Sequence, residues 1–156
     1  ASKLNLPVRG YISCATHCPY ENFVDPKIVS QIAKDLFKMG CYEISLGDTT
    51  GKGTPEQTLE VVKECLKYLS ADKLAGHFHD TYQNALDNIN VCLENGIKTF
   101  DASVGGLGGC PYSPGAKGNV ATEKVNKLLL SKGYETNLDR DKLKECSVIA
   151  QKLILN

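Results

Sequence analysis

The sequence contains no tryptophan, one methionine and only three histidines among its 156 residues. No apolar run approaches the roughly 20 residues that a membrane-spanning helix needs, and no signal peptide is visible at the N-terminus. The 18 basic and 18 acidic residues cancel, so we expect no general electrostatic attraction to nucleic acid or to an anionic membrane surface. The composition is typical of one globular domain with neither kind of partner.

A C-x-x-C pair is also absent, and the seven cysteines are scattered without zinc-ribbon spacing. We therefore expect most of them to be small buried side chains in a protein of a reducing compartment. Cys110 is the expected exception, because it lies in a glycine-rich segment.

Four strand–loop–helix units begin near residues 9, 41, 73 and 97. Asp25 before Pro26 and Thr54 before Pro55 are helix-start signals, and strands that alternate with helices indicate parallel βα units in an α/β fold. The expected strands are 9–15, 41–46, 73–79 and 97–104, and the expected helices are 26–39, 55–69, about 81–95, 122–131 and 139–153.

Long loops after the strands are typical of a (β/α)8 TIM barrel, whose active site lies at the C-terminal ends of the strands. A doubly wound sheet is the alternative, but no G-x-G-x-x-G opens the first helix, so its dinucleotide-binding form has no support. A complete barrel needs about 250 residues, so four units make half a barrel with two unpaired edges. We expect one domain over residues 1–156, with a helical extension at about 132–156. The expected apolar side chains of its inward face are Ile12, Ile44, Leu74, Phe100 or their neighbours.

His77 and His79 fall two residues apart at the end of an expected strand, followed by Asp80. Side chains alternate faces along a strand, so both imidazoles point the same way and could bind a metal. The alternative is a pair of hydrogen-bonded or partly exposed histidines. Other polar residues follow the strand ends and are expected to converge on the same edge of the sheet: Ser13, Cys18, Asp48, Cys110 and Asn119.

Residues 105–119 contain six glycines and Cys110. Glycine permits unusual backbone angles, so a glycine-rich segment with a cysteine indicates an active-site lid. A surface loop with an incidental thiol is one alternative, and a phosphate-binding loop is another, although the G-K-[ST] signature is missing. The glycines assigned to the lid are Gly105, Gly106, Gly108 and Gly109.

Several of these segments resemble the 3-hydroxy-3-methylglutaryl-CoA lyase family. The resemblance is dense from Val8 to about Ala121 and weaker beyond it. The segments that carry it are Ser13-Cys14-Ala15, Cys18-Pro19-Tyr20, Gly40 to Thr49, His77 to Tyr82, Gly105 to Tyr112 and Gly115 to Asn119.

The resemblance implies a (β/α)8 barrel of which this chain supplies the last four βα units and a C-terminal helix. It also implies a bound Mg²⁺ or Mn²⁺, with His77, His79 and Asn119 matching three of the family's ligands. The fourth ligand, an aspartate beside an arginine on the family's first strand, has no counterpart in this chain.

The resemblance further implies cleavage of an acyl-CoA thioester to acetyl-CoA and acetoacetate, as in ketone-body formation and leucine degradation. His77 and Cys110 would handle protons, Asp48 would act with them, and Asp80 and Glu123 would orient the site. A loop- or helix-capping role is the alternative for Asp48 and Glu123.

The expected partner besides the substrate is a second copy of the chain, in a homodimer. The expected location is the mitochondrial matrix in a eukaryote and the cytoplasm otherwise. Because the first strand has no counterpart here, the chain alone is expected to be an inactive fragment. Two other functions stay open: a catalytically silent half-barrel that pairs with another chain, and a related Claisen enzyme similar to isopropylmalate or homocitrate synthase.

Overall fold

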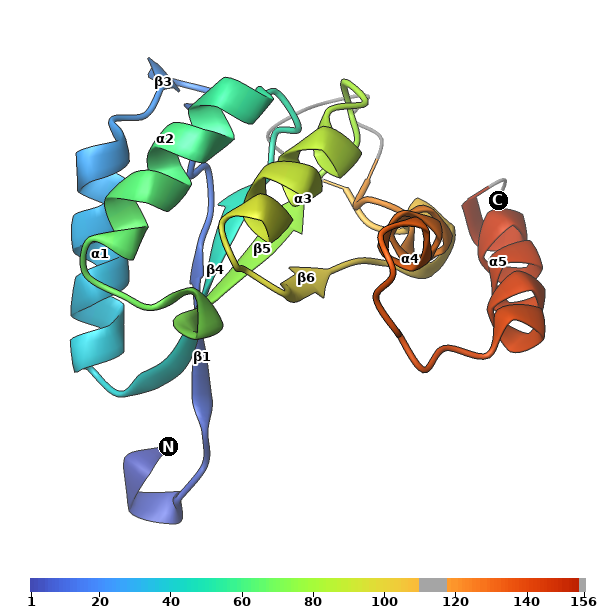
Figure 1. Cartoon of the computed structure of the whole chain (residues 1–156), viewed down its shortest axis with the longest axis horizontal. Coiled ribbons are helices and arrows are strands. Elements are labelled where there is room, and N and C mark those ends of the chain that lie inside the picture. The colour runs from blue at the N-terminus through green and yellow to red at the C-terminus, as the bar shows by residue number, and fades with distance from the viewer. Residues whose placement is uncertain (110–117, 155–156) are drawn as a thin grey trace.

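The computed structural model describes residues 1–109 and 118–154, and it has an α/β fold around a four-stranded parallel sheet (Figure 1). The strand order is β1-β4-β5-β6, so consecutive βα units lie side by side, as the alternation of strands and helices predicts. The strands are β1 (Val8–Ile12), β4 (Cys41–Asp48), β5 (Leu74–Phe78) and β6 (Thr99–Asp101).

The five predicted helices are present, with α3 beginning a few residues later than expected. A small antiparallel pair of strands within the 13–24 segment was not predicted. The helices are α1 (Pro26–Lys38), α2 (Pro55–Leu66), α3 (Ala85–Glu94), α4 (Thr122–Ser131) and α5 (Arg140–Ile154). The shorter elements are β2 (His17–Cys18), β3 (Asn22–Phe23), and the 3-10 helices η1 (Ser2–Leu4), η2 (Ala71–Lys73) and η3 (Val104–Gly106).

The predicted helix starts are confirmed in detail. Asp25 accepts a hydrogen bond from the backbone N–H of Lys27 at 2.9 Å. Thr54 and Gln57 form a reciprocal capping box, and Pro26 and Pro55 occupy the first helical positions. Local sequence therefore fixes where α1 and α2 leave the loops that follow β1 and β4.

The two faces of the sheet differ in chemistry. Ile12, Ile44 and Leu74 are buried in the hydrophobic core beneath α1, α2 and α3, and Phe100 packs against that core. The prediction that these four side chains line the inward face is therefore wrong. Strand alternation places the intervening residues on the inward face, and most of these are polar.

The sheet curves around this polar face. In a flat sheet, β1 and β6 would lie roughly 14 Å apart, because neighbouring strands are about 4.8 Å apart. Nevertheless, Arg9 Nη1 on β1 donates a hydrogen bond to Asp101 Oδ1 on β6 at 2.7 Å. The polar face is therefore concave, as in the wall of a barrel.

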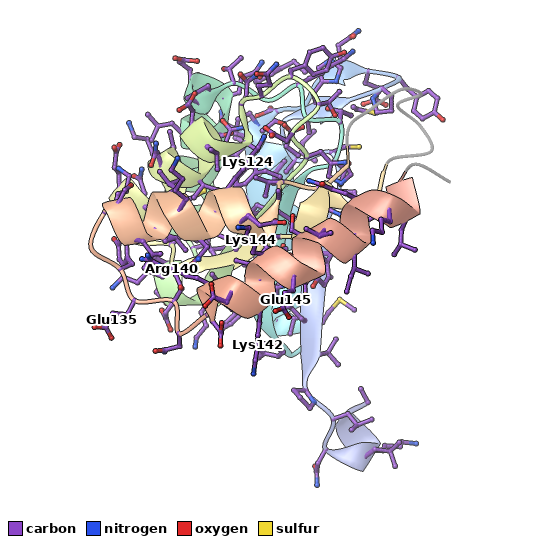
Figure 2. The ribbon with its side chains drawn as sticks, turned by 90° about the vertical axis from the view of Figure 1, so that its right-hand side faces the viewer. Lys124, Glu135, Arg140, Lys142, Lys144 and Glu145 are labelled. Carbon is purple, nitrogen blue, oxygen red and sulfur yellow. The ribbon has the colours of Figure 1, made fainter. Side chains whose placement is uncertain are left out.

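The C-terminal helix α5 lies against α4 and η3, and Ala150 is its buried residue at this contact. Val148, Ile149 and Leu153 of this helix are exposed, with Ile149 60% and Leu153 64% accessible. Figure 2 shows charged side chains of both signs on this part of the molecule, including Lys124 of α4 and Arg140, Lys144 and Glu145 of α5. Among the described residues, no helix combines the length and the apolar character needed to cross a membrane.

The cysteine prediction is confirmed for Cys41, Cys65 and Cys92, which are buried. It is wrong for Cys146, which is exposed on α5, while Cys14 and Cys18 are only partly buried. Burial raises the pKa of the Cys92 thiol to about 12, and burial, helped by Glu64, raises that of Cys65 to about 12. These two thiols are therefore protonated core side chains.

Candidate active site

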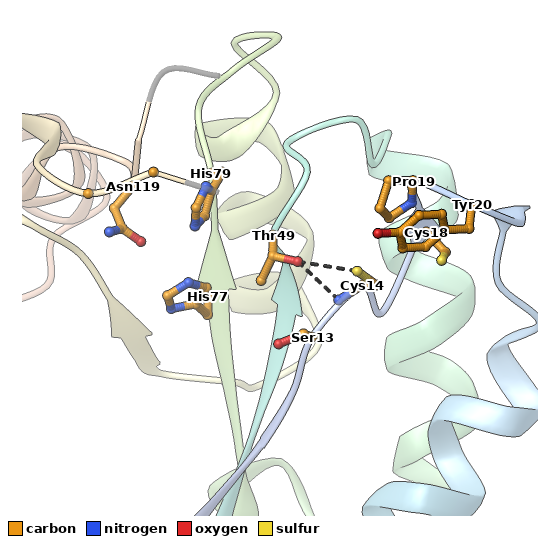
Figure 3. A pocket seen from close by; sticks show the side chains of 11 residues that line it. Ser13, Cys14, Cys18, Pro19, Tyr20, Thr49, His77, His79 and Asn119 are labelled. Carbon is orange, nitrogen blue, oxygen red and sulfur yellow. Dashed lines mark hydrogen bonds between the residues drawn. The ribbon is translucent and has the colours of Figure 1, made fainter. Parts of the chain in front are cut away.

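A pocket of about 520 Å³ lies at the C-terminal ends of the strands (Figure 3). This is the edge of the sheet at which the sequence predicts that polar residues converge. The pocket is lined by Ser13, Cys14, Cys18, Pro19, Tyr20, Thr49, His77, His79, Gly108, Gly109 and Asn119.

His77 and His79 lie on one face at the end of β5, as strand alternation predicts, and their ring centroids are 5.5 Å apart. The Nδ1 atom of each ring is buried and has no hydrogen-bond partner among the described residues. Burial and the neighbouring His77 lower the pKa of His79, against an opposing effect of Asp48. His79 is therefore neutral at pH 7, which is the form that binds a metal ion.

Asn119 is brought to this pair by backbone pairing with the end of β5. It forms an antiparallel bridge with His79, flanked by hydrogen bonds from Asp80 N to Gly118 O (3.1 Å) and from Val120 N to Phe78 O (3.0 Å). Its side-chain Nδ2 donates to the carbonyl of Leu107 at 2.9 Å, which fixes the amide plane. Figure 3 shows the amide oxygen on the side of the two imidazoles.

These three side chains fit part of a divalent-cation site. They offer two imidazole nitrogens and one amide oxygen, a mixed set that suits Mn²⁺ and that Mg²⁺ accepts when further oxygen ligands are added. Within residues 1–109 and 118–154, no group of three or more His, Cys, Asp and Glu side chains could hold a metal. Three ligands leave positions of a six-coordinate cation to be filled by other groups or by water.

Asp48 does not line the pocket. Its carboxylate is buried and accepts hydrogen bonds from Thr50 Oγ1 and Gly51 N, both at 3.1 Å, and from Gly53 N at 2.8 Å. It is on the face of β4 opposite to His77, because the two residues differ in strand phase. This placement favours the loop-capping alternative over the catalytic role predicted for Asp48.

Asp80 and Glu123 also hold backbone and side chains in place. Asp80 pairs with Lys124 Nζ at 2.7 Å and so ties the end of β5 to α4. Both oxygens of Glu123 accept from the backbone N–H of Gly105, at 3.0 and 3.1 Å. Burial would raise the pKa of Glu123, but hydrogen bonds from Ser147 and from backbone N–H groups outweigh it and lower the pKa. Glu123 therefore holds the backbone at the start of the glycine segment, through Gly105.

The glycine segment is held close to Asn119. Gly108 has φ +104°, and a Cβ there would lie 2.6 Å from Asn119 Nδ2. A Cβ on Gly118 would lie 1.8 Å from the carbonyl oxygen of Gly108, so only glycine fits this approach. Gly105 and Gly106 also have positive φ, but Cys110 and the rest of the predicted lid, residues 110–117, lie outside the described residues.

The concave face below the pocket carries an ion network that the sequence reading missed. Arg9 donates to Glu43 Oε2 at 2.6 Å through Nε and to Asp101 Oδ1 at 2.7 Å through Nη1. Asp101 Oδ2 accepts from Ser45 Oγ at 2.9 Å and lies 3.4 Å from His77 Nδ1. In the sequence, these residues occupy strand positions that alternation places on the same face as His77, and this pattern could have predicted the network.

The charges of this network stabilise one another. Burial would raise the pKa of Asp101, but the nearby His77 imidazole, the hydrogen bonds from Arg9 and Ser45 and the charge of Arg9 lower it to about 2. Burial would lower the pKa of Arg9, and the hydrogen bonds to Asp101, Glu43 and Tyr11 raise it instead. Both groups are therefore ionised throughout the neutral range.

Comparison with known proteins gives one family and a consistent set of relatives. The family model described as HMGL-like matches residues 8–149. "Hydroxymethylglutaryl-CoA lyase" of Pseudomonas mevalonii is 48% identical over 95% of this chain and 49% of its own length. "Hydroxymethylglutaryl-CoA lyase, mitochondrial" of Arabidopsis thaliana is 52% identical over 92% of this chain and 31% of its own. "3-hydroxy-3-methylglutaryl-CoA lyase, cytoplasmic" of Rattus norvegicus is 49% identical over 93% of this chain and 42% of its own length.

Solved structures agree with these relatives. The HMG-CoA lyase of Brucella melitensis superposes with a TM-score of 0.97 at 49% identity, covering 100% of this chain and 55% of that one. An HMG-CoA lyase of Acinetobacter baumannii, solved with coenzyme A and 3-methylmalate, has a TM-score of 0.83 at 36% identity, covering 89% and 46%. The chain therefore spans about half or less of the length of the curated relatives described here and about half of these solved chains.

Proposed function

The chain belongs to the HMGL-like family, which has a TIM-barrel fold, and on this premise we propose that it forms part of a hydroxymethylglutaryl-CoA lyase. Such an enzyme cleaves 3-hydroxy-3-methylglutaryl-CoA into acetyl-CoA and acetoacetate. The observation that carries the proposal is the convergence of His77, His79 and Asn119 in one pocket at the strand ends. A pocket of about 520 Å³ is large enough for the acyl end of such a thioester.

The reaction breaks a carbon–carbon bond next to a tertiary alcohol. The hydroxyl loses its proton and becomes the ketone of acetoacetate, and the bonding electrons leave as the enolate of acetyl-CoA, which must then gain a proton. A bound Mg²⁺ or Mn²⁺ would supply positive charge beside the hydroxyl and lower its pKa.

The residues of this chain divide the remaining work. His77, His79 and Asn119 would hold the cation. His77 is also assigned to proton handling, a task that would use its basic nitrogen when that nitrogen is not bound to the cation. Cys110 is assigned to proton transfer near the leaving enolate. An HMG-CoA lyase crystallised with coenzyme A supports an acyl-CoA thioester as the substrate class.

The part of the barrel that this chain forms is also a proposal. Four parallel strands in sequential order, and relatives at least about twice as long, support four consecutive βα units of a (β/α)8 barrel. The family resemblance of the motifs assigns them to the last four units. The cation's remaining ligands would then come from the other four units. Relatives named mitochondrial and cytoplasmic match at similar identity, so the mitochondrial location stays a prediction.

Product analysis tests the proposed reaction. The complete protein, incubated with 3-hydroxy-3-methylglutaryl-CoA and Mg²⁺, should release acetyl-CoA and acetoacetate in equal amounts, measured by mass spectrometry. A parallel incubation with acetyl-CoA and a 2-oxo acid should give no condensation product. The reverse pattern would replace the lyase with a Claisen enzyme of the isopropylmalate synthase kind.

The 156-residue chain alone should self-associate and have negligible lyase activity. β1 and β6 each have an edge that no strand among the described residues pairs with, and such edges promote association. A two-fold dimer that closes an eight-stranded barrel is the simplest product. Sedimentation at micromolar concentration tests the association, and a well-folded monomer would contradict it.

Activity of the isolated chain separates the lyase fragment from the silent half-barrel. Neither should turn over alone, but only the fragment should gain acetoacetate-forming activity when the preceding half of a family member is added. Turnover by the chain alone at the rate of a complete lyase would show that the catalytic centre is misplaced in this proposal.

Alkylation of Cys110 should inactivate the complete enzyme. The thiol is expected to react with iodoacetamide because it lies in a glycine-rich segment, and bound substrate should protect it. Peptide mass spectrometry alongside the activity assay checks this prediction. Loss of activity with Cys110 unmodified would assign the sensitive thiol elsewhere, and Cys18 is the next candidate because it lines the pocket.

A further inference from the structure

We propose that Asp101 is a positioning residue for His77, whose imidazole proton it holds on Nδ1 so that Nε2 keeps a free lone pair. The inference deepens the proposed function, on which it rests for the role of His77 in the pocket. It adds a carboxylate from β6 to the candidate metal site, whose side chains come from the end of β5 and from Asn119.

The strand register places the two side chains on the same face. His77 and Asp101 are direct partners in the parallel pairing of β5 with β6. His77 Nδ1 lies 3.4 Å from Asp101 Oδ2, slightly beyond hydrogen-bond geometry, and has no other partner among the described residues. Asp101 is thus the acceptor available to a buried Nδ1–H group.

The carboxylate of Asp101 is itself held in one orientation. Arg9 Nη1 binds Oδ1 at 2.7 Å, while Ser45 Oγ donates to Oδ2 at 2.9 Å. Arg9 is fixed in turn by its 2.6 Å contact with Glu43. Donors on both oxygens prevent the carboxylate from turning away, and Oδ2 retains acceptor capacity for one more donor.

This arrangement discriminates between the two neutral forms of His77. With the proton on Nδ1, an N–H group faces an anionic oxygen and needs only a small adjustment to form a hydrogen bond. With the proton on Nε2, the lone pair of Nδ1 would face that anion, and the two would repel. The carboxylate therefore selects the Nδ1–H form, as carboxylates do for histidines that bind metals.

The consequence for the pocket is a His77 ring of fixed orientation with its basic nitrogen at Nε2. Either task proposed for His77, binding a cation or accepting a proton, needs that lone pair. Asp101 does not itself line the pocket, so its effect on the pocket passes entirely through the imidazole of His77.

Nitrogen NMR of the complete protein, freed of metal with a chelator, tests the assignment without substrate or metal. Imidazole ¹⁵N shifts of histidine-labelled protein, recorded at about pH 8, well above the ordinary imidazole pKa of about 6.5, report which nitrogen carries the proton. We expect His77 to be protonated on Nδ1. Asp101→Asn should move the proton population toward Nε2, whereas Asp101→Glu should largely retain it on Nδ1. Asp87→Asn, on the exposed face of α3, is the matched control and should change nothing.

Protonation of wild-type His77 on Nε2 would overturn the inference, and this result needs no variant to fold. Unchanged Nδ1 protonation in a folded Asp101→Asn protein would overturn it too. The NMR spectra do not depend on turnover. They can therefore contradict this inference while the lyase proposal stands, and the product analysis can contradict the lyase proposal while this inference stands.

Discussion

Replacing Arg9 with methionine should lower the free energy of unfolding by about 3 kcal/mol, because it leaves two carboxylates without their cation. Arg9 and Glu43 have side chains only 15% and 13% exposed, so water replaces the lost interaction poorly. Asp101 is 25% exposed and loses a 2.7 Å contact, which moderates the expected cost on that side. Urea denaturation measures this loss as a lower midpoint concentration, and the dependence of the unfolding free energy on urea concentration should stay unchanged.

Lys67→Met is the matched control for this substitution. Lys67 pairs with Glu64 one turn away on the surface, and its side chain is 57% exposed. Removing an exposed pair of this kind should cost no more than about 0.5 kcal/mol. Similar losses in the two variants would mean that the network on the concave face contributes no more than a surface ion pair.

Replacing His79 with alanine should weaken Mn²⁺ binding by the complete protein at least 10–100-fold, which is roughly the loss seen when even an outer-shell partner of a metal ligand is removed. His79 is buried, and its Nδ1 has no hydrogen-bond partner among the described residues, so no hydrogen bond competes with a cation for that nitrogen. Titration with Mn²⁺ measures the effect.

His17→Ala is the control for His79→Ala. It removes the third histidine of the chain, which belongs to β2 and does not line the pocket. This variant should bind Mn²⁺ like the wild type. Unchanged affinity in His79→Ala, with both variants folded, would remove His79 from the metal site.

Short-range patterns predicted most of the fold and part of the site. The helix starts at Asp25 and Thr54 depend on neighbouring residues and were read correctly. The shared orientation of His77 and His79 follows from strand alternation alone. Asn119 was assigned through family resemblance, and the structure shows the cause of its position, the antiparallel bridge to His79.

Long-range contacts account for what sequence reasoning missed. Arg9 and Asp101 are 92 residues apart, and only the curvature of the sheet brings them together. In the sequence, only the shared strand phase of the two residues connected these charges, and the curvature that brings them into contact could not be predicted from it. Asp48 was expected at the pocket because it follows the predicted strand 41–46. It is the last residue of β4, and its strand phase directs its carboxylate to the backbone of the following loop, which favours the loop-capping alternative.

The pocket can act as proposed only if His77 and His79 hold one divalent cation, and pulsed EPR of bound Mn²⁺ examines this directly. In the complete protein with ¹⁵N-labelled histidine, the spectrum should show couplings to two imidazole nitrogens. His79→Ala should leave one coupling, and His17→Ala should leave both. Bound Mn²⁺ without coupling to any histidine nitrogen would contradict the metal site and, with it, the metal-assisted cleavage proposed for this protein.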